Sequence, residues 1–230
     1  MEKGYAPEYM YYVRSGYIGT QAHTWTQWTG DPSSDFTKHS GLPAQLSGML
    51  AAGMSGIPFL GSDIGGFVWT FKPTKELWIR WTQLGTFSGT MHTQTHGTAL
   101  FNEPKSHIHD WSEGTYAWRK NAKFRTQLLP YMYDAAHEVR ETGLPMMRHL
   151  LLHYPSDRMA ISQEYEYMFG DSLLVAPVVE EGKLGRDVYL PEGDWYFLNG
   201  DGMTYEETDG RFRVKRTPLY TGKQTVYREC

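Results

Sequence analysis

The sequence predicts an α/β fold followed by a β fold: half of an eightfold (β/α)8 TIM barrel, then a small antiparallel β-sandwich. Two observations carry this prediction. Up to residue 170, short apolar runs alternate with long helical patterns, which is the rhythm of βα units. From residue 171 onward, short strand-like runs are broken by Gly, Pro, Asp and Asn, which is typical of antiparallel sheets. The predicted domains are therefore residues 1–170 and 171–230.

The first region contains four strand candidates and four helix candidates, the content of half a barrel. The strand candidates are 17–21, 56–60, 86–91 and 145–150, and the helix candidates are 42–53, 74–84, 115–141 and 158–169. Thr74 is a capping residue, and apolar residues follow it at helical spacing. Pro130 is expected to kink or split the helix from residue 115.

The second region contains short strands separated by turns. A continuous apolar run at 173–179 is followed by strand candidates at 186–190, 194–198, 205–207, 211–215 and 224–228. The turn signals lie at 191–194 and 199–202. This pattern predicts that the chain ends in an antiparallel sandwich.

Composition excludes several classes of function. The chain has 230 residues, 40% of them hydrophobic, which is enough for a sizeable core. A net charge of −4 with scattered basic residues argues against nucleic acid or an anionic membrane as partner. The single cysteine, Cys230, excludes an internal disulfide and a cysteine metal site. The chain has no membrane-length apolar run, and its start lacks a signal-peptide core, which favours the cytoplasm while leaving the compartment open.

Asp31 is the first candidate for a catalytic residue. It ends the turn Trp28-Thr29-Gly30-Asp31, whose glycine allows the acid to be presented to a ligand. A sugar-cleaving enzyme needs a carboxylic acid beside the scissile oxygen. The alternative is a structural turn aspartate that caps the element after Pro32. Spacing alone favours neither interpretation.

Asp63 lies in a similar context, about one barrel repeat later. It follows a strand candidate and precedes the glycine pair in Ser62-Asp63-Ile64-Gly65-Gly66-Phe67. Acids on loops after successive barrel strands are typical of a catalytic face. The alternative for Asp63 is a helix cap or a buried ion pair.

Seven segments, in order along the chain, resemble glycoside hydrolase family 31. They are Arg14-Ser15-Gly16-Tyr17, Trp28-Thr29-Gly30-Asp31, Ser62-Asp63-Ile64-Gly65-Gly66-Phe67, Arg80-Trp81-Thr82-Gln83-Leu84-Gly85, Leu129-Pro130-Tyr131-Met132-Tyr133, Gly143-Leu144-Pro145-Met146-Met147-Arg148 and Leu174-Val175-Ala176-Pro177-Val178. The family contains retaining α-glucosidases, α-xylosidases and sulfoquinovosidases. The resemblance implies that this chain corresponds to the later part of the barrel and the following β domain.

The resemblance also implies roles for individual residues. Asp31 matches the family's general acid/base. Arg14 and Asp63 match an active-site Arg and Asp, and we expect them to pair with each other and support sugar binding. Gln21 and Trp28 are weaker candidates for sugar contact. The family needs neither a metal nor a cofactor, and the implied partner is a carbohydrate substrate.

The chain departs from the family pattern near residue 92. The family has an Arg, one further residue and a sugar-binding His after the third strand. Ungapped counting puts His92 on the Arg and Gln94 on the His, whereas a two-residue insertion puts His96 on the His. The departure argues against plain glucose specificity. Within the family the sulfoquinovosidase-like branch is the nearest resemblance, based on the Asp63 loop and residues 152–154 and 178–182.

The family's nucleophilic Asp precedes the Arg14 segment, and the 13 residues before Arg14 contain no such motif. The predicted function is therefore a retaining α-glycosidase, present here as a fragment that lacks the nucleophile and is inactive alone. Its implied partner is the missing N-terminal half. The alternative is a non-catalytic carbohydrate-binding or barrel-completing subunit.

Two other groups of residues have competing interpretations. His107, His109 and Asp110 could bind zinc in an unrelated metal hydrolase, but a loop exposed to solvent is the favoured interpretation. Arg148 and His149 could lie at the catalytic rim, but a structural role at a strand end is favoured.

Overall fold

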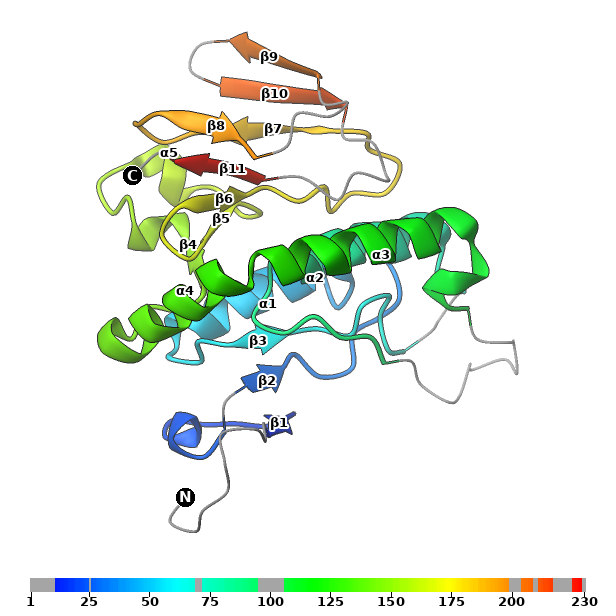
Figure 1. Ribbon diagram of the computed structural model, residues 1–230, viewed down its shortest axis with the longest axis horizontal. Helices are drawn as coiled ribbons and strands as arrows, with labels where there is room; N and C mark the ends of the chain where they lie inside the picture. Colours follow the sequence, from blue (N-terminus) through cyan, green and yellow to red (C-terminus); the bar gives the residue numbers. More distant parts are fainter. Residues whose placement is uncertain are drawn as a thin grey trace.

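The structure, a computed structural model, describes residues 11–24, 26–68, 72–94, 106–198, 204–208, 211–216 and 225–228. Figure 1 shows three levels: parallel strands, then helices, then antiparallel sheets. The parallel strands and long helices come from the earlier part of the chain, and the antiparallel sheets come from the later part. The predicted change from α/β to β structure is confirmed.

The parallel sheet contains β1 (Tyr12–Val13), β2 (Thr26–Trp28) and β3 (Leu60–Gly61), in that order. Helix α1 (Leu42–Met54) connects β2 to β3, which makes a βαβ unit. An isolated parallel bridge between Asp63 and His92 continues the pattern beyond β3. This sheet is the predicted part of a (β/α)8 barrel.

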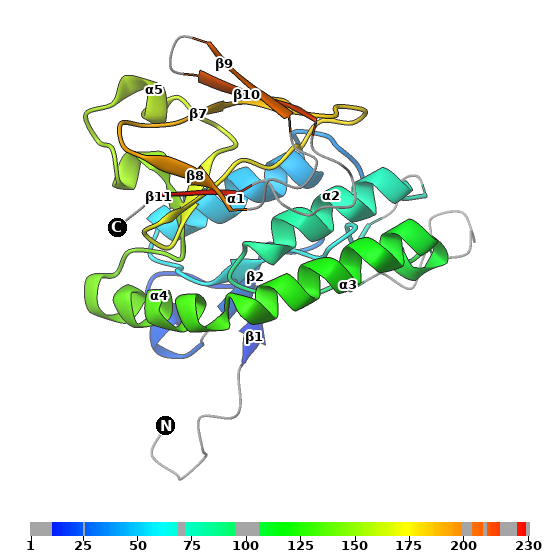
Figure 2. The same cartoon turned by 45° about the horizontal axis from the view of Figure 1, so that its top comes forward.

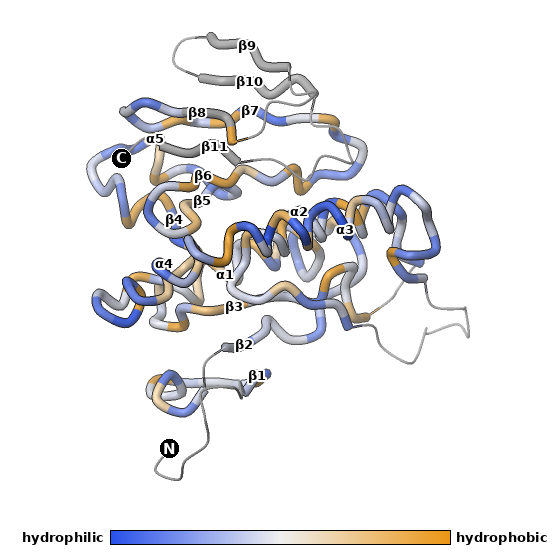
Figure 3. The backbone as a smooth tube through the Cα atoms, viewed as in Figure 1, coloured by the Kyte–Doolittle hydropathy of each residue, from blue (hydrophilic) through white to orange (hydrophobic). Residues whose placement is uncertain are grey.

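Helices α1, α2 (Lys75–Thr86) and α3 (Ser112–Gln127) lie side by side in both ribbon views (Figures 1 and 2). Helix α2 begins where Thr74 accepts a hydrogen bond from the backbone of Leu77. Hydrophobic and hydrophilic residues alternate along α2 and α3 in Figure 3. The apolar faces fill the main core, in which Leu42, Trp78 and Trp81 are almost fully buried. The helices predicted from 42 and 74 are confirmed.

Pro130 divides the third predicted helix, as expected. Helix α3 ends at Gln127 and α4 (Leu129–Thr142) begins two residues later. Pro130 lies in the first turn of α4, where a backbone N–H would have no partner within the helix, so the N–H that proline lacks is not missed. Gly143 ends α4 with a φ of 76°, a conformation that glycine adopts readily.

Two antiparallel sheets form the later part of the chain. The larger has the order β4 (Met147–His149), β5 (Tyr167–Phe169), β6 (Leu173–Val175), β11 (Thr225–Arg228) and β8 (Trp195–Phe197). The smaller has the order β7 (Arg186–Tyr189), β10 (Arg211–Arg216) and β9 (Thr204–Thr208). Met168 and Leu174 of the larger sheet share a buried cluster with Val188 of the smaller one, as in the predicted sandwich.

Two predictions between residues 145 and 169 are wrong. Residues 147–149 do form a strand, but β4 pairs antiparallel with β5 and is not a barrel strand. The predicted helix 158–169 is only the short α5 (Arg158–Ile161), followed by β5. Asp157 starts α5 by accepting hydrogen bonds from two backbone amides. Residues 167–169 are fully buried and form backbone hydrogen bonds with β4 and β6, so they are a strand and do not continue the helix. The antiparallel sheet thus begins before residue 170.

Two predicted barrel strands are also wrong. Residues 17–21 form a turn and the 3₁₀ helix η1 (Thr20–Ala22), because Gly19 has a φ of 95° and reverses the chain. The true strands β1 and β2 lie on either side of it. Thr86 is the last residue of α2, residues 87–91 form no strand, and the chain reaches the next strand position only at His92.

Candidate active site

The candidate residues gather at one end of the parallel sheet. Arg14 directly follows β1, Asp31 follows β2 by three residues, and Asp63 follows β3 by two. The bridge at His92 adds a fourth position beside Asp63. Because carboxyl ends of parallel strands lie at the same edge, the fold brings these four side chains to one end of the sheet.

Arg14 pairs with Asp31 and not, as predicted, with Asp63. The guanidinium Nη2 lies 3.2 Å from Oδ2 of Asp31, and the Asp31 side chain is 27% exposed. Strands β1 and β2 are neighbours, so the residue after β1 reaches the loop after β2 more directly than the loop after β3. Gly30, with a φ of 89°, turns the chain immediately before Asp31. The carboxylate is therefore accessible and oriented by a cation.

Asp63 pairs with His92. Its side chain is fully buried, and Oδ1 accepts a hydrogen bond from Nε2 of His92 at 2.7 Å. The other carboxylate oxygen has no hydrogen-bond partner among the described residues. A buried carboxylate oxygen without a partner is costly, so Oδ2 is available for a donor that is not part of the described structure.

Tyr12 is a site residue that the sequence analysis missed. Its hydroxyl oxygen lies 2.9 Å from Nδ1 and 2.8 Å from Nε2 of His92. Its ring stacks on Trp28 with 5.2 Å between centroids. Burial, with a contribution from the charge of Asp63, raises the pKa of Tyr12 and keeps the phenol neutral. The Tyr-x-Arg spacing was the available signal, since it places Tyr12 and Arg14 on one face of a strand.

The glycine pair after Asp63 allows its loop to pack closely. Gly65 has a φ of 91°, and a Cβ atom there would lie 2.3 Å from the Trp78 ring of α2. Gly66 has a φ of 83°, and a Cβ there would meet the side chain and backbone of Ser34. Only glycine permits both the backbone conformation and the contact. The loops that carry Asp31 and Asp63 are thereby packed against each other.

The other predicted sugar contacts differ in their positions. Trp28 is partly buried, and its indole N–H has no partner among the described residues. Gln21 donates to the carbonyl of Gly56, before β3, so it lies toward the opposite end of the sheet from Asp63 and outside this group. Gln94 is exposed. His96 lies outside the described residues.

The remaining candidates lie in structural positions. His109 is 71% exposed in the 3₁₀ helix η2 (Ile108–Asp110), and the described residues contain no group of three potential metal ligands. Arg148 is buried, donates to the carbonyl of Pro145 and pairs with Glu138 of α4 at 2.5 Å. His149 accepts from the backbone of Leu151. The structural interpretation of Arg148 and His149 is confirmed. None of the described helices has the length and apolar composition needed to cross a bilayer.

Acids paired with a cation or an imidazole, beside aromatic rings, at the carboxyl ends of barrel strands are an arrangement typical of barrel-type glycoside hydrolases. Residues 2–135 match the family model "Glycosyl hydrolases family 31 TIM-barrel domain", and residues 143–226 match "Glycosyl hydrolase family 31 C-terminal domain". The chain belongs to glycoside hydrolase family 31.

Individual relatives agree with this assignment. The chain is 34% identical to a sulfoquinovosidase of Agrobacterium fabrum, over 98% of this chain and 33% of the relative. It is 36% identical to an isomaltosyltransferase of Sporosarcina globispora, over 80% of this chain and 17% of the relative. A family 31 sulfoquinovosidase from E. rectale, solved with an aza-sugar inhibitor, superposes with a TM-score of 0.83 at 34% identity and covers 96% of this chain and 32% of that one. The chain spans a third or less of each of these relatives.

Proposed function

We propose that this chain supplies the acid/base part of a retaining α-glycosidase site. The observation that carries the proposal is the accessible Asp31, on a glycine turn after β2 and 3.2 Å from Arg14. Membership of family 31 supports the reaction class. The carboxylate nucleophile would come from a segment outside these 230 residues, either of the same polypeptide or of a second one.

The proposed reaction has two steps. In the first, Asp31 gives its proton to the glycosidic oxygen while the nucleophile attacks the anomeric carbon and the leaving group departs. In the second, the Asp31 carboxylate removes a proton from water, and the water oxygen displaces the nucleophile. Arg14 would orient Asp31 through both steps. A retaining pair of carboxylates must lie roughly 5–5.5 Å apart, so the reaction requires the missing segment.

The remaining site residues would bind the sugar. The unpartnered Oδ2 of Asp63 would accept a sugar hydroxyl, and Trp28 would offer its indole N–H as donor. Of the candidate sugars, we favour a sulfoquinovoside-type substrate, because relatives with that name cover nearly the whole chain. The alternatives are the α-glucosides and α-xylosides suggested by the names of other relatives.

A second candidate function is a non-catalytic, barrel-completing subunit. Strand β1 is an edge of the described parallel sheet, and next to it Tyr17 is 81% and Ile18 is 85% exposed. Edges of parallel sheets are normally paired and covered. This surface suits additional barrel strands whether or not the completed barrel is catalytic.

Fusion to the preceding part of a relative separates these two functions. The upstream segment of the Agrobacterium sulfoquinovosidase would be joined to this chain, and release of nitrophenol from α-sulfoquinovoside and α-glucoside substrates would be measured. We expect no turnover by the chain alone and turnover by the fusion. In the fusion, Asp31→Ala should lower turnover of a substrate with a poor leaving group by about 10²–10⁴-fold. With a substrate that has an activated aryl leaving group, the first step of the reaction should be largely unaffected by this change.

Azide gives the decisive control. It needs no general base, so it should restore turnover of the activated substrate by the Asp31→Ala fusion and yield an α-configured glycosyl azide. Asp134→Ala, which removes an exposed acid on α4, should leave activity unchanged. A folded fusion in which Asp31→Asn keeps full activity and azide has no effect would reject the acid/base role and favour the barrel-completing subunit.

A further inference from the structure

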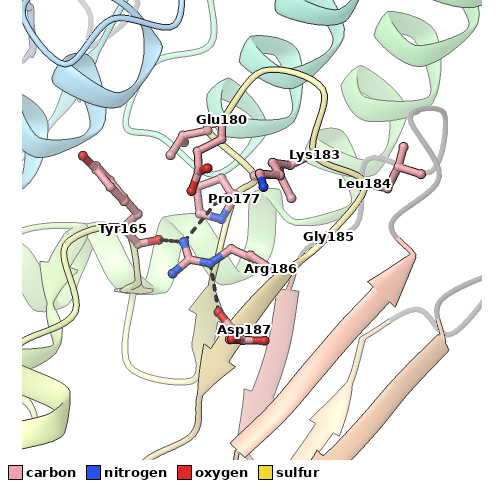
Figure 4. Close-up of a pocket in the computed structure, with 10 residues that line it drawn as sticks. Tyr165, Pro177, Glu180, Lys183, Leu184, Gly185, Arg186 and Asp187 are labelled. Carbon is pink, nitrogen blue, oxygen red and sulfur yellow. Dashed lines mark hydrogen bonds between the residues drawn. The ribbon is translucent and has the colours of Figure 1, made fainter.

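A surface cavity of about 590 Å³ lies beside the loop that joins β6 to β7, and nothing in the proposed reaction uses it. Figure 4 shows its lining, which includes Tyr165, Pro177, Glu180, Lys183, Arg186 and Asp187. The volume falls within the roughly 300–1,000 Å³ range of small-molecule sites.

Arg186 fixes one wall of this cavity. Its guanidinium donates to the carbonyl of Tyr165 at 2.7 Å and to that of Pro177 at 3.2 Å, and it pairs with the buried Glu166 at 3.0 Å. One side chain of β7 thereby holds two other segments, residues 165–166 and Pro177. The wall is held in place before any ligand arrives, which lowers the entropic cost of binding.

Helix α2 fixes the opposite wall. The backbone N–H of Gly182 donates to the Glu76 carboxylate at 3.1 Å, and the fully buried Arg80 donates to the carbonyl of Lys183 at 2.7 Å. Loop residues 182 and 183 are therefore held by α2 of the barrel part of the molecule. The Lys183 side chain does not take part in these bonds.

The cavity is connected to both catalytic-face loops. Lys38, in the loop between Asp31 and α1, pairs with Glu164 at 3.7 Å, and its Nζ lies 5.6 Å from the centre of the Tyr165 ring. Glu76 lies in the first turn of α2, the helix that follows the Asp63 loop. Both contacts come from the carboxyl ends of the barrel strands. The cavity therefore lies toward the same end of the molecule as Asp31 and Asp63.

The lining chemistry indicates an uncharged, polar ligand. Arg186 is already neutralised by Glu166, and the other charged lining residues, Glu180, Lys183 and Asp187, carry both signs with no excess of cations, so the cavity does not select an anion. Tyr165, Pro177 and Leu184 supply apolar surface between these charges. Sugars combine C–H faces that pack on rings with hydroxyls that need donors and acceptors.

We propose that this cavity is an accessory binding site for neutral α-linked oligosaccharides, separate from the sugar that is cleaved. The choice of a neutral carbohydrate rests on the proposed function in its α-glucoside form, since a sulfoquinovoside carries a sulfonate, and the location rests on the cavity alone. Bound here, a chain would be held on the side of the molecule that carries Asp31.

Affinity electrophoresis of the chain as it stands tests the proposal. Native gels would contain dextran or soluble starch, with a β-linked glucan as the specificity control. We expect the α-glucans to retard the chain. Tyr165→Ala should weaken retardation by about fivefold or more, the loss expected for one aromatic platform. Leu184→Glu should also weaken it, and because Leu184 is 60% exposed this change should not affect folding.

Two matched controls identify the site. Tyr133→Ala removes a tyrosine that is 67% exposed on α4, and Asp31→Ala alters the catalytic face. Both variants should be retarded like the wild type. Absence of retardation in every α-glucan, or retardation that survives both cavity variants, would overturn the proposal. Neither outcome would affect the acid/base role of Asp31, which the fusion tests separately.

Discussion

The parallel-sheet part and the sandwich differ in how completely their buried polar atoms are hydrogen-bonded. In the described structure, the buried side-chain nitrogen and oxygen atoms without a partner all lie between residues 27 and 80; they are Gln27 Nε2, Trp28 Nε1, Ser34 Oγ, Asp63 Oδ2, Trp78 Nε1 and Arg80 Nε. In the sandwich, Glu166 is equally buried, but it accepts bonds from Arg186 and from the backbone of Tyr189.

This difference separates structural from functional polar groups. Folded proteins leave few buried polar groups without partners, and each exception needs an explanation. In the described part of the sandwich no buried side-chain nitrogen or oxygen lacks a partner, and residues of both sheets share one buried cluster. The parallel sheet has an edge at β1, and Trp28 and Asp63, at the carboxyl ends of its strands, have buried polar atoms without partners among the described residues. We infer that the parallel-sheet part is organised to receive a substrate and further strands.

The largest expected effect on stability is in the sandwich. Arg186→Met would leave the Glu166 carboxylate buried without its counter-ion. We expect a loss of about 3 kcal/mol in the free energy of unfolding at pH 8. The loss should be smaller at pH 5, because burial, opposed by Arg186, raises the pKa of Glu166 to about 7. Urea unfolding at both pH values measures these losses.

Asp63→Asn is the matched change in the parallel-sheet part. Its Oδ2 has no partner to lose, and the amide oxygen can still accept from His92. We expect a cost of about 1 kcal/mol or less. A cost equal to that of Arg186→Met would contradict the distinction between the two regions, since it would make Asp63 a structural residue.

Glu166 should also set the pH dependence of the sandwich. Its pKa is raised from 4.5 to about 7, so between these values the folded protein holds a proton that the unfolded chain has released. Stability is therefore present at low pH and lost as pH rises through 7. Glu166→Gln should remove this loss and be more stable at pH 8 by about 1–3 kcal/mol. Superimposable pH–stability curves for the two proteins would contradict this prediction.

The N-cap of α2 should contribute less to stability than the Glu166–Arg186 pair. Thr74→Ala removes the side-chain oxygen that accepts from Leu77, with an expected cost of about 1 kcal/mol in thermal or urea unfolding. Thr74→Ser keeps the acceptor and should retain most of the stability. Because α2 also holds loop residues 182 and 183, one shared transition for both parts would show that they unfold together. Equal losses for Ala and Ser would show that the cap is unimportant.

The smallest expected change in stability concerns the exposed surface beside β1. Ile18→Lys should shift the free energy of unfolding by less than about 0.5 kcal/mol, because the side chain is 85% exposed. It should nevertheless reduce self-association of the chain in sedimentation velocity experiments. Met159→Lys, at a 40% exposed position of α5, should not reduce it. Equal effects of the two variants would show that association is not localised at the β1 edge.

Local sequence determined helices α1 to α4, most sandwich strands and the positions of the acids. Periodic apolar residues and the cap at Thr74 predicted α2, and Pro130 predicted the break before α4. Glycine turns placed Asp31 and Asp63 on loops after strands. These features depend on neighbours within a few residues, which is the range over which periodicity, capping and turn preferences act.

Only the tertiary structure decided which residues meet. The pairs Arg14–Asp31 and Asp63–His92, and the contact of Tyr12 with His92, join residues from different strands. The same holds for β4, whose local pattern suits either sheet and whose antiparallel partner lies about twenty residues further on. A strand's periodicity states which side chains share a face, but not which strand lies beside it. That choice depends on long-range packing and hydrogen bonding, which no local segment contains.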